Sequence, residues 1–298
     1  MKQLVIFLFF LTPIFGLNQN SESFKFIENK GQWEENIKYK TNLSAGNLYF
    51  ESNTLTYNFY NEEEVETYFH AHNSHHSKKD ITKFSAHSYK VEFVGGNSTT
   101  IQSSKKNETY YNYFIGADKN KWASNVASFQ EITYKNVYES IDLVFYSNYE
   151  SLKYDFILKP SANPSSIKLK YNGVDEIKLS KGRLVIKTSV NKVIEEKPYA
   201  YQIINGKKIK VECEYTLDNY ILGFNFPDGY DKTKELIIDP TLIFSTFSGS
   251  TSNNFGYTAT FDRDGFLYSG STVFGPNYPT TIGAYDVTFN TTGIVDIA

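Results

Sequence analysis

The feature that most constrains the fold is a period of two between apolar and polar residues, repeated along most of the chain. Its clearest instance is the segment 207–217, in which every second residue from Ile209 to Leu217 is apolar and the residues between are charged or threonine. Successive side chains of a β-strand point to opposite faces, so this pattern predicts one antiparallel strand with a buried face and a solvated face. Cys213 falls on the buried face, where it would act as a small hydrophobic residue and not as a reactive thiol.

The same alternation recurs through the middle of the chain and predicts an all-β protein. Five further strands are expected at 89–93, 141–146, 152–159, 167–171 and 184–186. Residues 147–151 would form the loop of a hairpin between two of these strands, and Lys181 with Gly182 would form a turn. The 24 Tyr and 24 Phe suit pleated, half-buried surfaces. Helical patterns are sparse, and the one expected helix is short, at 62–66, with Asn61 as its N-cap.

The sequence divides into a leader, a large β domain and a shorter C-terminal segment. We expect residues 18–242 to form one or two antiparallel β-sandwich-like units. Pro240 interrupts an apolar run at 236–244 and pushes the preceding residue to an extended conformation, which favours a boundary there. Residues 243–298 alternate short β runs with turn residues, like one unit of a repeat array that needs neighbours to bury its apolar face. We therefore expect the chain to be the front part of a longer protein.

Residues 1–17 have the layout of a secretory signal peptide. Lys2 precedes an apolar run at 4–11, Pro13 ends the run, and Gly16 supplies a small residue for cleavage. The run is too short for a transmembrane helix, which needs about 20 apolar residues, and no later segment is long enough. A single cysteine excludes an internal disulfide. Export without disulfides favours a secreted or cell-surface protein of a bacterium.

Six short motifs in a fixed order resemble a known family. They are FIENKGQW at 26–33, YYNYFIG at 110–116, KWASNV at 121–126, YDF at 154–156, KPYAYQ at 197–202 and IIDPTL at 237–242. The series resembles the uncharacterised N-terminal domain, of the DUF7948 type, of large exported Bacteroidetes proteins. The resemblance implies that residues 243–298 are the first, incomplete SBBP-type repeat of a β-propeller. It also implies type IX secretion and a link to adhesion or gliding motility, and it carries over no catalytic residues.

Histidines supply the one candidate metal site. His70, His72, His75 and His76 fall within seven residues, and two of them are four apart, which on a helix would place two imidazoles on one face. The surrounding segment at 61–87 is charged and poor in apolar residues, which favours a solvated loop. We therefore expect no bound metal and no cofactor.

Aromatic residues supply the candidate ligand-binding positions. Trp33 and Trp122 lead a set that could form a platform on which sugars stack, although aromatic side chains more often fill cores. The other members of the set are Tyr110, Tyr111, Tyr113, Tyr199 and Tyr201.

Motifs of the common enzyme classes are absent from the sequence. There is no G-x-S-x-G elbow, no H-E-x-x-H, no Walker loop and no G-x-G-x-x-G. Glu195 and Glu196 are neighbours, and in a strand they would point to opposite faces, which makes them a poor acid–base pair. Asp262 to Gly265 has the start of a calcium loop, but its glycine comes too early and a hairpin turn is favoured.

These patterns predict a non-enzymatic, secreted or cell-surface structural or interaction protein. Its partner would be a surface ligand, either protein or glycan, and the net charge of −3 argues against nucleic acid. The alternative is a carbohydrate-binding module of a polysaccharide-processing surface protein. A third hypothesis is a hydrolase, which a pocket with two carboxylates of raised pKa would favour.

Overall fold

The computed structural model of the chain describes residues 24–43, 45–62, 64–65, 83–148 and 151–240, and the strands at 242–245, 254–261, 267–273 and 296–297. The predicted signal peptide lies outside these residues. The predicted all-β class is confirmed, because every strand pair in the described part is antiparallel. The expected N-cap is also present: Asn61 Oδ1 accepts a hydrogen bond from the backbone N–H of Glu64 at 3.2 Å.

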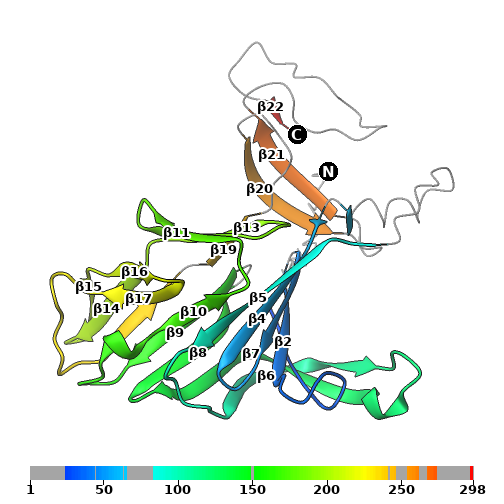
Figure 1. Cartoon of the computed structure of the whole chain (residues 1–298), viewed down its shortest axis with the longest axis horizontal. Helices are drawn as coiled ribbons and strands as arrows, with labels where there is room; N and C mark the ends of the chain where they lie inside the picture. Colours follow the sequence, from blue (N-terminus) through cyan, green and yellow to red (C-terminus); the bar gives the residue numbers. More distant parts are fainter. Residues whose placement is uncertain are drawn as a thin grey trace, which may run out of the picture.

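The body is one 15-stranded antiparallel sheet that folds over on itself (Figure 1). Its shared strand is β7 (Ala123–Tyr138), which pairs along one edge with β6 (Ile101–Tyr113). The other edge of β7 pairs first with β1 and farther along with β8, so the sheet divides there into two wings. The first wing runs, in order, β1 (Phe26–Glu28), β2 (Tyr39–Leu43), β3 (Gly46–Phe50), β4 (Thr54–Tyr60), β5 (Ala86–Phe93), β10 (Leu169–Asn172), β17 (Ile221–Asn225) and β16 (Glu214–Asp218). The second wing runs β8 (Ile141–Asn148), β9 (Ser151–Leu158), β18 (Leu236–Asp239), β14 (Tyr199–Ile204) and β15 (Lys207–Val211).

The two wings pack face to face around an aromatic core. Phe50 of β3 lies against Phe145 of β8 with ring centroids 5.0 Å apart, although these strands are not neighbours in the sheet. Phe156 of β9 and Phe224 of β17 meet in the same way at 5.8 Å. Such edge-to-face pairs add to the burial of the rings themselves. The fold is therefore sandwich-like, as predicted, and the described residues form neither a closed barrel nor a propeller.

The strand predicted at 207–217 is in fact two strands, which corrects the sequence analysis. β15 ends the second wing and β16 ends the first, so only Glu212 and Cys213 separate the two ends of the large sheet. Cys213 is buried, as predicted, and burial raises the pKa of its thiol to about 12. Ile209 is exposed and not buried, because it lies on the edge strand β15, whose residues before Val211 all face solvent.

The strands predicted from alternation elsewhere correspond to β5, β8, β9, β10 and β12. The loop predicted at 147–151 is shorter, since Asn148 already pairs with Ser151. Lys181 and Gly182 form the expected turn with φ of 53° and 77°, the left-handed conformation that a two-residue hairpin requires.

A four-stranded sheet closes one opening of the sandwich. It contains β11 (Glu176–Ser180), β12 (Arg183–Lys187), β13 (Lys192–Glu195) and β19 (Leu242–Ser245), in that order. Leu184, Ile186 and Val193 of this sheet join the core of the large one, and β19 lies against β9. The chain thus changes sheets at Pro240, between β18 and β19.

The described C-terminal strands form a separate three-stranded sheet. These strands are β20 (Asn254–Phe261), β21 (Leu267–Val273) and β22 (Asp296–Ile297). Phe261 pairs with Leu267, so the two strands that flank residues 262–265 do form an antiparallel pair, while the turn itself lies outside the described residues. The propeller repeat and the domain boundary after 242 stay predictions.

Candidate functional site

Four of the exposed large apolar side chains in the described part gather at one end of the β6–β7 hairpin, and three of these four are the most exposed of all. Figure 1 shows the connected ends of these two strands extending away from the folded sheet. Tyr110, Phe114, Ile115 and Trp122, here termed the hairpin tip, are exposed by 61, 59, 76 and 39 %. Large apolar side chains that cluster on a projecting element, and do not scatter singly, mark a contact surface.

The hairpin tip is held by its own contacts. The indole Nε1–H of Trp122 donates to the carbonyl oxygen of Gly116 at 3.1 Å. The ring of Phe114 meets the indole edge-on at 5.7 Å, and Lys119 Nζ lies 5.6 Å from the centroid of the indole. A loop fixed in this way loses less conformational entropy on binding than a mobile loop would.

Trp33 packs beside the same hairpin, next to the last strand pair before the loop, and is not part of the hairpin tip. Its ring packs edge-on against Tyr113 at 5.4 Å, and Lys40 Nζ lies 5.7 Å from its centroid. Together with Tyr111 these rings cover a small second core of Ile27, Ala123 and Val126. Five of the seven predicted platform residues therefore line this hairpin, but Trp33 and Trp122 do not form one flat platform.

The loop that carries Trp33 is organised by Asn29. Its Oδ1 accepts hydrogen bonds from the N–H groups of Gly31 and Trp33, and its Nδ2 donates to the carbonyl oxygens of Trp33, Glu34 and Ile37. Gly31 has a φ of 103°, which residues with a Cβ rarely adopt. The motif at 26–33 is thus explained by loop architecture, with no reaction chemistry implied.

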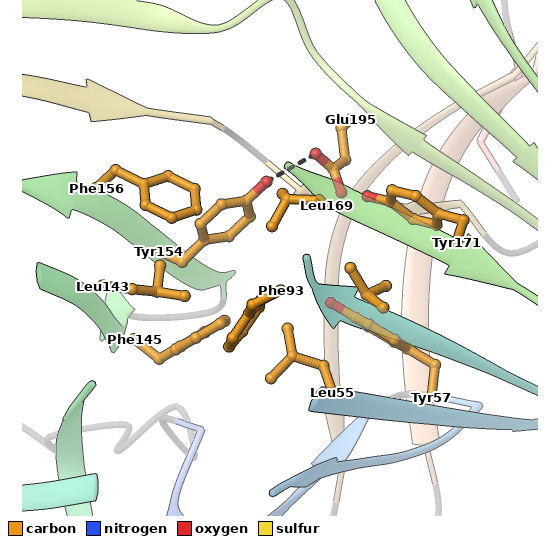
Figure 2. Close-up of a pocket in the computed structure, with 11 residues that line it drawn as sticks. Leu55, Tyr57, Phe93, Leu143, Phe145, Tyr154, Phe156, Leu169, Tyr171 and Glu195 are labelled. Carbon is orange, nitrogen blue, oxygen red and sulfur yellow. Dashed lines mark hydrogen bonds between the residues drawn. The ribbon is translucent and has the colours of Figure 1, made fainter. Parts of the chain in front are cut away.

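The interior of the sandwich contains a buried carboxyl group that alternation did not predict. Glu195 projects from β13 into the core, where its Oε2 accepts hydrogen bonds from the hydroxyls of Tyr154 at 2.9 Å and Tyr215 at 3.3 Å. Figure 2 shows Glu195 above a cavity, with Tyr154 and Tyr171 on either side of it and apolar side chains below. Glu196 points to the other face and pairs with Arg183 at 3.4 Å, so the two glutamates do diverge, as predicted.

Among the described residues, the groups that act on the Glu195 carboxyl are tyrosine hydroxyls, and none is a cation. Burial raises the pKa of this carboxyl, and the hydrogen bonds from Tyr154, Tyr215 and Tyr171 oppose that rise. The cavity beneath it has a volume of about 20 Å³, which is space for about one water molecule. Its lining holds one carboxyl group and no room for a substrate, whereas glycoside hydrolysis commonly uses a pair of carboxyl groups. The arrangement is a buried polar network within the core.

The outer face of the second wing carries a second polar cluster. The register of β9 with β18 places Asp239 directly across from Asp155. Tyr146 donates to both carboxylate oxygens of Asp155, at 3.2 and 3.3 Å, and Lys153 donates to Asp239 at 3.0 Å. Burial, and then the charge of Asp239, raise the pKa of Asp155 to about 7.

The two remaining platform tyrosines lie beside that cluster, on β14, far from the hairpin tip (Figure 1). Tyr199 and Tyr201 have ring centroids 5.8 Å apart. Lys208 Nζ lies 3.6 Å from the centroid of Tyr201, so a cation already covers that ring.

The candidate metal ligands His70, His72, His75 and His76 lie outside the described residues, and their metal binding stays a prediction. His87 is described, and its two ring nitrogens lie 2.9 Å from Ser189 Oγ and 2.7 Å from the carbonyl oxygen of Gly173. Across the described ranges, no three His, Cys, Asp or Glu side chains gather as metal ligands would. No helix in the same ranges is long and apolar enough to cross a membrane.

Comparison with known proteins identifies the family and nothing more specific. Neither a curated protein nor a solved structure matches the chain. A family model described as a domain of unknown function, DUF7948, matches residues 26–241, which is well over half of the sequence. The chain therefore belongs to the DUF7948 family.

Proposed function

We propose that the chain is a non-enzymatic interaction module of a secreted or cell-surface protein, and that it binds its partner through the hairpin tip. The observation that carries this proposal is the exposure of four large apolar side chains on one projecting and internally fixed hairpin. Tryptophan and tyrosine dominate the energetic centres of protein interfaces, and both are present at the tip.

The proposal that the protein is secreted or lies on the cell surface rests on the sequence. The signal-peptide layout at 1–17, the single cysteine and the resemblance to exported Bacteroidetes proteins support export, a role in adhesion or gliding, and a propeller after the β domain. The cavity at Glu195 has space for about one water molecule and none for a substrate, which supports a module without turnover.

The test is binding of the purified, fluorescently labelled chain to intact cells of the encoding organism from which its gene has been deleted. We expect saturable binding that the double variant Phe114→Ser, Ile115→Ser weakens about 10-fold or more, since central apolar contacts contribute most of the binding energy. Ile203→Ser is the matched control, because Ile203 is 51 % exposed on β14, away from the hairpin. Equal binding by the tip variant and the wild type, or no saturable binding, would refute the proposal.

The second candidate function is carbohydrate binding, and the exposed rings of Trp122 and Tyr110 favour it because sugars stack on such rings. The same cells separate the two candidates. Protease treatment of the cells would abolish binding to a protein partner, whereas periodate oxidation would abolish binding to a glycan.

A further inference from the structure

One ion pair on the outer face of the second wing differs from every other ion pair in the described part of the chain. Lys153 Nζ lies 3.0 Å from Asp239 Oδ1, and the two side chains are exposed by only 15 and 21 %. In each of the other ion pairs among the described residues, the cationic side chain is exposed by 40 % or more. Burial of two charges costs free energy that a neutral amide in the same place would not cost.

The strand register explains why these two side chains meet. The pairing of β9 with β18 places Asp239 directly across from Asp155. Lys153 precedes Asp155 by two residues on the same face of β9, so it is the diagonal neighbour of Asp239. That diagonal measures about 7–8 Å between backbones, which a lysine side chain can span. Strand pairing therefore holds an amine against a carboxyl group, as a bond-forming step between them requires.

A second carboxyl group, that of Asp155, lies beside the pair. The hydroxyl of Tyr146 donates to both of its oxygens, at 3.2 and 3.3 Å. Burial, and then the charge of Asp239, raise the pKa of Asp155 to about 7, so this group both gives and takes protons near neutral pH. A carboxyl group in that state can act as a general acid and base for the groups next to it.

Tyrosine rings surround the three side chains. Tyr146 is directly across from Lys153 in the pairing of β8 with β9, and Tyr199 is directly across from Asp239 in the pairing of β14 with β18. Tyr201 is close enough that the charges of Asp155 and Asp239 contribute to the raised pKa of its hydroxyl. Such rings limit the contact of the cluster with water, which would otherwise stabilise the separate charges.

We propose that Lys153 and Asp239 form an intramolecular amide bond that cross-links β9 to β18, with Asp155 as the proton-transfer group. Lys153 Nζ passes one proton to the Asp239 carboxylate, and its lone pair then attacks Asp239 Cγ to form the C–N bond. Asp155 takes a second proton from the nitrogen and gives its own proton to the departing hydroxyl. The C–O bond breaks, one water molecule leaves, and Asp155 returns to its starting state. The bond removes the charge of Asp239, whereas burial, the larger cause of the raised pKa of Asp155, remains.

The cross-link would join two parts of the chain that are 86 residues apart in sequence. The single cysteine cannot form an internal disulfide, so the chain has no other cysteine-based bond of this kind. β18 is the last strand of the large sheet before the chain enters the closing sheet at β19. A covalent bond there would pass a pull on the C-terminal segment to β9 and keep β18 from separating. The inference concerns how the module stays folded, and it stands whatever the hairpin tip binds.

The test is intact-mass spectrometry of the purified whole chain after incubation near pH 7. We expect a mass about 18 Da below the value calculated from the sequence, which is the loss of one water molecule. Tandem mass spectrometry of a protease digest should show a branched peptide that joins Lys153 to Asp239. Lys153→Arg and Asp155→Asn should each restore the calculated mass, because the first removes the amine and the second the proton-transfer group. Asp239→Asn should lose about 17 Da, because ammonia leaves in place of water.

Lys135 and Asp142 supply the matched control. Lys135 Nζ lies 2.8 Å from Asp142 Oδ2, but Lys135 is half-exposed and the pKa of Asp142 is lowered. This pair should remain ionic, and Lys135→Arg should leave the loss of water unchanged. A wild-type mass equal to the calculated one, with no branched peptide, would refute the bond. A loss of water that persists in Lys153→Arg would refute it too, because that loss arises elsewhere. Neither result changes the outcome of the cell-binding test of the hairpin tip.

Discussion

Asp155 should make the stability of the fold fall as the pH rises through neutrality. Its pKa in the folded chain is raised from 3.8 to about 7, first by burial and then by Asp239 directly across the strand pair, while Tyr146, Lys153 and Lys208 oppose the rise. The folded chain therefore holds a proton that the unfolded chain releases near pH 4. A group whose pKa is higher in the folded chain than in the unfolded chain stabilises the fold when the pH is below its pKa in the unfolded chain. This contribution is lost as the pH rises through about 7.

The size of the effect follows from the same two values. A carboxyl whose pKa moves from 3.8 to about 7 changes the free energy of unfolding by at most about 4 kcal/mol. Asp155 is partly exposed, so solvent screening reduces the expected change to about 1–2 kcal/mol. Asp155→Asn cannot ionise, and its amide oxygen can still accept a hydrogen bond from Tyr146.

The assay is urea unfolding of the wild type and of Asp155→Asn at pH 5, 6, 7 and 8. Relative to the wild type, the variant should gain about 1–2 kcal/mol between pH 5 and pH 8. Asp142→Asn is the control, because hydrogen bonds from Lys135 and from the N–H of Asn136 lower the pKa of Asp142 despite its burial. That variant should be less stable by a similar amount at all four pH values. A difference between Asp155→Asn and the wild type that does not change with pH would refute the reasoning.

Three further predictions concern the core and the sheet. Glu195→Gln should become more stable relative to the wild type as the pH rises above about 5, by urea unfolding, because burial among the tyrosines makes the carboxyl of Glu195 costly to ionise and raises its pKa. A difference between the variant and the wild type that does not change with pH would show that the pKa of Glu195 is not raised. Cys213 should react with a thiol reagent only when the chain unfolds, because it is buried and the pKa of its thiol is raised. The reaction can be followed spectroscopically with and without urea, and rapid labelling of the native chain would contradict the burial of Cys213. Gly46→Ala should cost about 3 kcal/mol or more in thermal or urea unfolding, since a Cβ at that position would overlap the carbonyl oxygen of Asn58. Gly223→Ala, whose Cβ would meet the Thr216 hydroxyl at 3.0 Å, should cost about 1 kcal/mol or less.

Alternation predicted the class of the fold and several strands in the middle of the chain, because one face of such a strand is buried and the other is solvated. It did not predict how strands associate. The break between β15 and β16 is an example: the period of two continues from Val211 through Cys213 to Tyr215, yet the chain passes there from one wing to the other. The period of two indicates which residues are buried. It is the same for one long strand and for two shorter strands joined by buried residues, so it cannot distinguish them.

The candidate sites were harder to predict, for a related reason. The aromatic content indicated ligand-binding residues, but the pattern could not separate Trp33, which covers a small core, from Trp122, which lies at an exposed tip. The difference arises because β6 and β7 continue past the folded sheet. The length of these two strands determines which aromatic rings pack against other residues and which stay exposed. Glu195 was missed because it occupies a position at which the period of two predicts a buried apolar residue. The signal that would have found it is an acidic residue at a position where the period of two requires burial, since such a residue needs hydroxyl or cationic partners from elsewhere in the fold.

The residues that hold the fold together are distinct from those that can act on a partner. The tyrosines around Glu195 come from β4, β5, β9, β10 and β16, so a single carboxyl joins both wings and the closing sheet, and any change there disturbs the whole body. The hairpin tip instead lies where β6 and β7 extend past the folded sheet, and its side chains contact one another. Substitutions there should therefore change binding without changing the free energy of unfolding, and that independence is the property expected of a site that selection can adapt to a ligand.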